Sequence, residues 1–355
     1  MKRHFLFLLL PWLLGAAVLS ACSDSDDDTP QVAADTTRLA ALIDSVTVGY
    51  NAATEGNKPG NYATGSKAPL KTALDLATST RANGQYTQLQ IDNATANLRR
   101  AVAAFRSNLI EDVSVANLVA QWKFEGNAND ATANGHNGTP KTGPTGPGSA
   151  PGDGGTLPRL VADRFNRPNQ AYEFTNGAYI EVPYAAALNP PAMTISLWCK
   201  RFDSNDANYL LSLNRWNGFK FQLQGAGKPF LTATTTTGIF DRDAESGIVA
   251  VNTWTHVVTS YVDGTLKFYL DGKLVKTWTN TQGPMKPIPE PVPLAIGQQL
   301  PKDTYNRAPT AGQDPGYFEY YGPAFFKGQI DDIRFYNRAL TDAEVTSIFT
   351  IENTL

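Results

Sequence analysis

The spacing of hydrophobic positions changes twice along the chain. Residues 5–18 form an almost unbroken apolar run, whereas residues 35–112 repeat apolar side chains every three or four positions. From about residue 113 onward, short runs alternate apolar and polar positions and are separated by Gly, Pro, Asn and Asp. Because a helix repeats every 3.6 residues and a strand every two, a small all-α domain followed by an all-β domain is predicted.

The helical segment is expected to be a three-helix bundle. Its apolar stripes predict helices over about residues 35–50, 69–83 and 87–105. Pro69 suits a first helical turn, and Thr87 is a candidate N-cap. Little strand signal is present in this part of the chain, so we expect the bundle to fold as a separate unit.

The β segment, about residues 115–350, is expected to be one sandwich. Its Asp271-Gly272 pair, flanked by alternating apolar positions, predicts a tight hairpin because both central residues of such a turn need positive φ. Many short strands with almost no helix are typical of a sandwich. The clearest strands are predicted at residues 119–124, 179–182, 254–261, 265–270, 273–278 and 325–336.

Residues 1–21 predict a signal peptide. Lys2 and Arg3 precede an apolar run that is shorter than the ~20 residues a membrane-spanning helix needs. The run ends in Leu19-Ser20-Ala21-Cys22, which resembles the lipobox of bacterial lipoproteins. That resemblance implies cleavage before Cys22, diacylglyceryl transfer to its thiol and acylation of the new amino terminus. An ordinary secretory signal with a coincidental cysteine is the alternative.

Residues 22–34 predict an acidic tether. The run from Ser23 to Asp28 holds only Ser and Asp, so a solvated spacer is one interpretation. The run also resembles the acidic export signal of Bacteroidota lipoproteins, which implies display on the outer face of the outer membrane. We therefore expect a lipid-anchored outer-membrane protein that faces the cell exterior.

The charge balance argues against a nucleic-acid partner. The chain carries 30 Lys and Arg and 33 Asp and Glu; without Lys2 and Arg3 the balance is 28 against 33, a net charge near −5. No basic patch is evident for nucleic acid or anionic lipid, so membrane attachment is expected through the lipid alone. Acylation of Cys22 leaves Cys199 as the other cysteine, which excludes an internal disulfide.

The helical segment resembles the FIVAR-like three-helix modules of bacterial surface proteins. Residues 67–74 and 90–105 carry the resemblance. It implies a spacer or a weak glycan-binding unit, and we favour the spacer because no cluster of chemically reactive side chains is evident here.

The β segment resembles the laminin G-like group of the concanavalin A-like superfamily. Its carrying motifs occur in the family order and cover nearly the whole segment, which implies a jelly roll. Two long loops, near residues 139–170 and 280–324, depart from the pattern. The motifs lie at residues 122–130, 171–183, 254–258, 269–272 and 326–341.

No catalytic motif is evident, so we expect a non-enzyme. Glycanases of this fold carry a Glu-x-Asp-x-x-Glu run with two catalytic carboxylates, and this chain lacks it. Glu173 and Glu181 could still meet across strands and form a carboxylate pair. A glycoside hydrolase or lyase with an unrecognised site is therefore the less favoured alternative. His256 lies in a strand motif, where a structural role is favoured over a Ser-His-Asp triad.

One structural Ca²⁺ is a further expectation. Folds of this kind hold calcium between the opening loop and the closing strand, where carboxylate and main-chain oxygens are suitable ligands. By motif position the candidates are Asp331 and Asp130, with the backbone near Gly126 and Asn127, while Asp332 is expected to point to the other face. The alternative is that Asp130 closes a turn and Asp331 caps loop amides.

Aromatic residues outside the family's core positions suggest a ligand surface. Trp216 lies in a turn-like string, and Tyr317, Tyr320 and Tyr321 lie in an aromatic loop. Sugars bind to aromatic faces with a few polar groups nearby, so we expect a non-catalytic carbohydrate-binding or glycan-capture module for a polysaccharide or glycoprotein ligand. A protein-binding adhesion module is the alternative, as is an aromatic loop that only protects a sheet edge.

Overall fold

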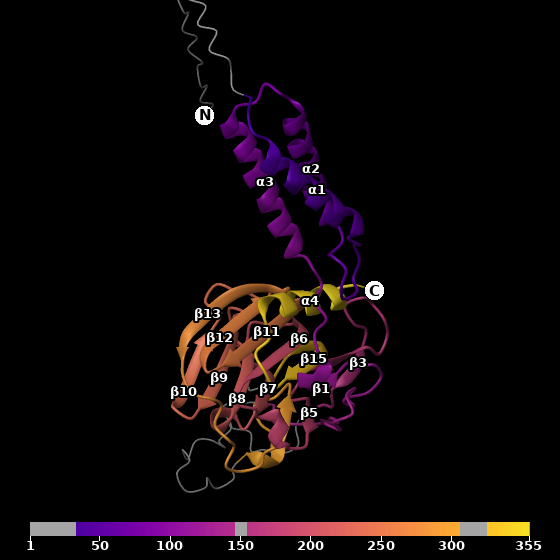
Figure 1. The fold of residues 1–355 in the computed structure, drawn as a ribbon. Coiled ribbons are helices and arrows are strands. Elements are labelled where there is room, and N and C mark those ends of the chain that lie inside the picture. The colour runs from indigo at the N-terminus through magenta and orange to yellow at the C-terminus, as the bar shows by residue number, and fades with distance from the viewer. Residues whose placement is uncertain (1–32, 146–154, 306–324, 355) are drawn as a thin grey trace, which may run out of the picture.

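The computed structural model describes residues 33–145, 155–305 and 325–354, which form a helical module joined to a β sandwich (Figure 1). The predictions for residues 1–32, which include Cys22, lie outside the described residues. Within the described ranges, no helix has both the length and the apolar character needed to cross a membrane.

The helical module contains the three helices that the apolar spacing predicts, α1 (Thr37–Ala52), α2 (Lys67–Ala82) and α3 (Gln88–Arg106). Thr87 caps α3 as predicted: its side chain accepts a hydrogen bond from the Gln90 amide, and the Gln90 side chain accepts one from the Thr87 amide. The module has a core of its own, made by Leu39, Ile43, Val46, Leu70, Leu74, Ala77, Ile91, Leu98 and Phe105.

Two antiparallel sheets form the sandwich (Figure 1). One contains β1 (Leu118–Trp122), β3 (Arg159–Val161), β4 (Ala171–Phe174), β6 (Met193–Arg201), β11 (Thr255–Val262), β12 (Gly264–Leu270), β13 (Lys273–Thr281) and β15 (Gly328–Tyr336). The other contains β2 (Thr139–Lys141), β5 (Tyr179–Val182), β7 (Asn208–Leu213), β8 (Phe219–Leu223), β9 (Pro229–Thr235), β10 (Gly238–Asp243) and β14 (Leu294–Ile296). The eight-stranded sheet has the order β13-β12-β11-β6-β15-β4-β3, with β1 paired to β15, and the seven-stranded sheet has the order β10-β9-β8-β7-β14-β5-β2.

The main core lies between the two sheets, because each strand turns alternate side chains inward. On β8, Phe219, Phe221 and Leu223 join this core, whereas Lys220 and Gln222 point to the outer face. The same alternation on the neighbouring strands closes the space between the sheets with apolar side chains. The predicted jelly-roll sandwich is therefore confirmed.

The predicted hairpin is also present between β12 and β13. Asp271 has φ 47° and Gly272 has φ 73°, the pair of positive values that a two-residue turn of this kind needs. The pairing of Leu270 with Lys273 closes the turn.

The C-terminal helix α4 (Asp342–Glu352) covers the outer face of the eight-stranded sheet. Its Val345 and Ile348 pack in a second apolar cluster with side chains of β1, β11 and β12. The helical module stands on this side, where the Glu111 amide donates to Ser347 Oγ at 2.7 Å (Figure 1). The outer face of the seven-stranded sheet therefore lies on the side of the sandwich opposite the module.

Candidate functional site

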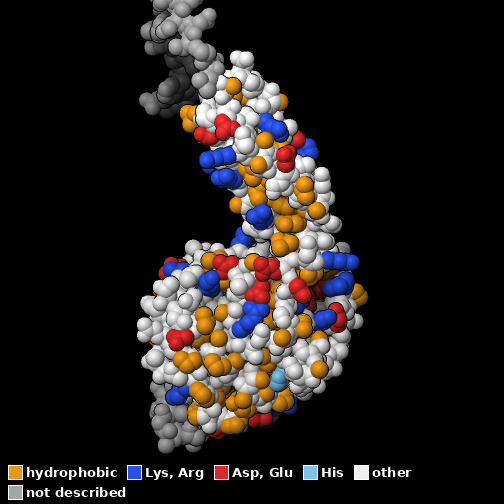
Figure 2. Space-filling view, in the orientation of Figure 1, with side chains coloured by type: hydrophobic (Ala, Val, Ile, Leu, Met, Phe, Trp, Pro, Cys, Tyr) orange, Lys and Arg blue, Asp and Glu red, His pale blue; other side chains and the backbone are white. Residues whose placement is uncertain are grey.

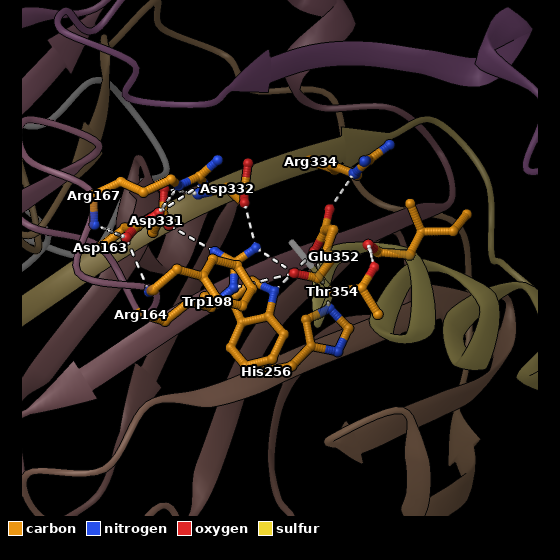
Figure 3. A network of polar contacts seen from close by, with 12 residues as sticks. Asp163, Arg164, Arg167, Trp198, His256, Asp331, Asp332, Arg334, Glu352 and Thr354 are labelled. Atoms are coloured by element: carbon orange, nitrogen blue, oxygen red, sulfur yellow. Dashed lines mark hydrogen bonds and ion pairs between the residues drawn. The ribbon is translucent and has the colours of Figure 1, made fainter. Parts of the chain in front are cut away.

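A buried charge network lies beneath α4 (Figure 3). The side chain of Arg164 is 6% exposed and donates to Asp331 at 2.6 Å and to Asp332 at 2.8 Å. Its guanidinium also donates to the main-chain oxygen of Glu352 at 2.6 Å and lies 4.5 Å from the ring centre of Trp198. The network therefore fastens the end of α4 to β15 with paired charges.

An irregularity in β15 brings both aspartates to Arg164. The pairing of β15 with β6 shifts register between Asp331 and Arg334, and Asp332 has φ 45°. The expectation that Asp332 points to the other face is wrong, because this bulge breaks the strand's alternation. Burial, with the neighbouring carboxylate of Asp332, raises the pKa of Asp331.

His256 belongs to this network and lacks the geometry of a catalytic triad. Its Nε2 is 2.7 Å from Ser196 Oγ and 4.0 Å from the Glu352 carboxylate, so the hydroxyl and the carboxylate lie at the same ring nitrogen. Its Nδ1 has no hydrogen-bond partner among the described residues. Burial and the charge of Arg164 lower the pKa of His256 to about 3, so the ring is neutral near pH 7.

The two glutamates left as a candidate carboxylate pair lie in different sheets. Glu173 is on β4 and accepts hydrogen bonds from Arg159 at 2.6 Å and from Gln329 at 3.0 Å. Glu181 is on β5 and accepts one from the Tyr179 hydroxyl at 3.0 Å. The hypothesis that they meet across strands is wrong, because β4 and β5 pair within separate sheets.

The two carboxylates predicted to bind calcium already accept hydrogen bonds from protein donors. Asp130 accepts four hydrogen bonds from donors on β1 and its own loop, Asn127 Oδ1 accepts one from the Asn129 amide, and Asp331 is held by Arg164. These contacts also fit the alternative in which Asp130 closes a turn. The two carboxylates as placed do not fit a shared Ca²⁺.

Gly126 also takes part in a local contact. Its amide donates to the main-chain oxygen of Asn169 at 2.9 Å, and its φ of 79° lies in the left-handed region that glycine adopts readily. In the part of the chain that the structure describes, no group of three or more His, Cys, Asp or Glu side chains is placed to hold a metal ion. A calcium ion therefore stays a prediction that no described residue cluster supports.

A cluster of three aromatic rings and one lysine lies on the outer face of the seven-stranded sheet. The Lys220 Nζ is 5.3 Å from the ring centre of Phe230, 5.6 Å from that of Trp216 and 5.9 Å from that of Tyr209. Lys220 is 9% exposed, and Trp216 and Phe230 are half-buried. These four residues, Tyr209, Trp216, Lys220 and Phe230, are called the Lys220 cluster below.

Local backbone geometry places the tryptophan in this cluster. Asn214 and Arg215 have φ of 53° and 44°, which ends β7 and begins the short 3-10 helix Arg215–Asn217. The Thr234 hydroxyl of β9 donates to the main-chain oxygen of Trp216. This short helix thus brings Trp216 beside Lys220, and the Arg215 guanidinium lies 4.5 Å from the Trp216 ring centre.

Polar groups border the Lys220 cluster on the same face. The Gln222 Nε2 donates to the main-chain oxygen of Asp206 at 2.9 Å, whereas its Oε1 has no partner among the described residues. On the next strands, the Thr232 hydroxyl donates to Asp241. Burial lowers the pKa of Lys220. Aromatic rings, a cation and an unpartnered acceptor on one face suit ligand binding, and the cluster itself holds no general acid or base pair.

Only one of the four predicted ligand residues can be placed. Trp216 lies in the Lys220 cluster, whereas Tyr317, Tyr320 and Tyr321 lie outside the described residues. Sequence analysis missed the other members of the cluster. The alternation within β8 puts Lys220 outward, but its ring neighbours follow only from the pairing of β7, β8 and β9.

Comparison with known proteins supports the fold. Residues 174–346 match the family model described as the concanavalin A-like lectin/glucanases superfamily. This match covers most of the sandwich and agrees with its two antiparallel sheets. No curated protein matches the chain at a significant level.

Several solved structures are similar to about two thirds of the chain. Domain 4 of AbnA, an extracellular arabinanase from Geobacillus stearothermophilus solved in complex with arabinotriose, has 20% identity and a TM-score of 0.47, and the match covers 65% of this chain and 98% of that one. The binding domain of Paraclostridial Mosquitocidal Protein 1 has 17% identity and a TM-score of 0.43, with 66% and 52% covered. The binding domain of botulinum neurotoxin DC, in complex with rat synaptotagmin II, has 14% identity and a TM-score of 0.43, with 66% and 51% covered. The chain thus spans about half the length of the toxin domains it matches.

Proposed function

We propose that the β sandwich is a non-catalytic carbohydrate-binding module whose ligand contacts the Lys220 cluster. The observation that carries the proposal is the arrangement of three aromatic side chains around one lysine on the outer face of a sheet. Sugar rings stack on aromatic faces, and nearby polar groups fix their orientation. The match of residues 174–346 to a lectin and glucanase family supports a sugar as the ligand class.

The position of the helical module supports a capture role. The module joins the sandwich at α4, on the side opposite the Lys220 cluster. We further propose that the chain is a lipoprotein held by Cys22, with residues 22–34 as its tether and the module as a spacer. An N-terminal anchor would then leave the proposed binding face directed away from the membrane.

The anchor has its own test. Cells expressing the chain would be labelled with a palmitate analogue and then treated with an external protease. We expect label on the wild-type chain and none on Cys22→Ala, and we expect intact cells to lose the exposed sandwich to the protease. Equal labelling of both chains would refute acylation at Cys22, and full protection from protease would refute surface display.

The binding proposal is tested by affinity electrophoresis of the full chain in gels that contain plant, algal or bacterial polysaccharides. We expect at least one polysaccharide to retard the wild type, and Trp216→Ala to abolish that retardation because it removes the stacking face. The matched control is Trp254→Ala, which removes a half-buried tryptophan outside the cluster and should leave retardation unchanged. Equal behaviour of the two variants, or no retardation by any polysaccharide, would refute the proposal.

A further inference from the structure

The ammonium group of Lys220 lacks an opposite charge. Among the described residues, its Nζ has no hydrogen-bond acceptor and no carboxylate within ion-pair distance, and it lies against the three rings of the cluster. The carboxylate of Asp241 acts on the charge of Lys220 from beyond ion-pair distance, and it already accepts the Thr232 hydroxyl. A side chain that is 9% exposed therefore brings a positive charge out of water with aromatic faces as its compensation.

Aromatic faces compensate a buried ammonium only in part. A cation-π contact contributes less free energy than a buried charge without an anionic partner loses in hydration. A second cation, Arg215, lies against the same Trp216 ring and donates to the neutral Gln299 side chain at 3.0 Å. Two cationic side chains therefore lie beside the Trp216 ring.

An unused acceptor lies beside the lysine. Gln222 is 7% exposed, and its Oε1 has no hydrogen-bond partner among the described residues. Its Cα lies opposite those of Tyr209 and Phe230 in the pairing of β7, β8 and β9, so its side chain borders the same three rings. A cation and an amide oxygen that can accept a hydrogen bond therefore lie side by side on this face. A sugar with one anionic group and one hydroxyl could pair with both.

We propose that the Lys220 cluster selects acidic glycans, with the carboxylate or sulfate of a sugar residue at Lys220 Nζ, its ring against Trp216, and a hydroxyl donated to Gln222 Oε1. This inference rests on the proposed carbohydrate-binding function and narrows its ligand class. An anionic group at Nζ would supply the charge partner that the described residues do not. Uronic acids and sulfated sugars share this chemistry, and the test separates them.

The test uses two matched pairs of polymers. Polygalacturonate and its fully methyl-esterified form share a backbone and differ in the carboxylate; dextran sulfate and dextran differ in the sulfate. Binding of the full chain would be measured by titration calorimetry at fixed salt. We expect at least one anionic polymer to bind about tenfold to a hundredfold more tightly than its neutral partner. The pair that shows this preference identifies the anionic group.

Two variants show whether the preference comes from this lysine. Lys220→Met keeps the length of the side chain and removes its charge, so we expect the anionic preference to disappear. Lys273→Met removes an exposed lysine from the β12–β13 turn and should leave the preference unchanged, which controls for nonspecific attraction. Thermal unfolding of each variant would show that the sandwich remains folded.

The outcomes distinguish a failure of acidic selectivity from a failure of carbohydrate binding. Equal affinity for both members of each pair, with binding still lost in Trp216→Ala, would overturn acidic selectivity and leave carbohydrate binding intact. An anionic preference that survives in Lys220→Met would also overturn the inference, because another cation would then be responsible. Absence of binding to all four polymers would overturn the assignment of these acidic classes, and the wider polysaccharide panel would then decide the function itself.

Discussion

Two buried cations, Arg164 and Lys220, lie against tryptophan rings on opposite sides of the sandwich, and their surroundings differ. Arg164 is 4.5 Å from the Trp198 ring centre and contacts two carboxylates and a main-chain oxygen. Lys220 is 5.6 Å from that of Trp216 and has no such partner among the described residues. The charge of Arg164 is compensated within the protein, whereas Lys220 is the proposed contact for an anionic ligand.

This difference separates a structural cation from a candidate ligand contact. A buried charge with full protein partners is strongly destabilising to remove, because its partners are then left unpaired. Removal of a charge that has no partners leaves no unpaired group in the protein. The space-filling view shows charged side chains of both signs gathered where the module meets the sandwich (Figure 2). Stability and binding measurements on the two sites should therefore give opposite patterns.

The largest expected effect is the loss of Arg164. Arg164→Met should lower the free energy of unfolding by about 3–5 kcal/mol, because Asp331 and Asp332 then share a buried site without a cation. Denaturant unfolding followed by fluorescence measures this change. The control is Arg159→Met, which breaks an ion pair whose arginine side chain is 73% exposed and should lower stability by only about 0–1 kcal/mol. Similar losses in both variants would remove the distinction between the two kinds of ion pair.

A smaller effect is expected from acid. The pKa of His256 is about 3 in the folded chain and about 6.5 when unfolded, so its contribution is complete above pH 6.5 and is lost as pH falls toward 3. Between pH 7 and pH 5 this residue alone should lower the free energy of unfolding by about 2 kcal/mol. His256→Gln cannot titrate, so its stability should fall less over the same interval. Identical pH slopes in both chains would contradict this account.

The smallest effect on stability is expected at Lys220. Lys220→Met should change the free energy of unfolding by less than about 0.5 kcal/mol or raise it slightly, since it removes a desolvated charge and keeps the packing against three rings. The same denaturant unfolding measures it. A loss of about 2 kcal/mol or more would show that Lys220 is a structural cation like Arg164, and the comparison between the two sites would no longer hold.

Much of the fold could be predicted because its signals are local. Apolar spacing located the three helices, Thr87 showed the start of α3, and Asp271-Gly272 showed the hairpin. Each of these depends on a few neighbouring residues and their φ and ψ preferences. The bulge at Asp332 was missed because strand alternation alone cannot show where a register shift occurs.

The candidate sites were harder to predict because they join distant segments. Arg164 lies in the loop of residues 139–170, which departs from the family pattern, yet it supplies the cation for two aspartates on β15. Glu173 and Glu181 are only eight positions apart, yet they lie in different sheets. Trp216 was identified from its turn-like context, whereas the surroundings of Lys220 depend on the pairing of three strands.

The junction at α4 determines how the molecule carries mechanical load. A pull between residue 33 and the Lys220 cluster passes along the helical module and enters the sandwich through the segment that leads to β1. The Glu111–Ser347 and Asn57–Thr354 hydrogen bonds resist it first, followed by the pairing of β1 with β15. Because β1 pairs with β15 in the eight-stranded sheet, such a pull acts on that pairing before it reaches β7, β8 and β9, which carry the cluster in the other sheet.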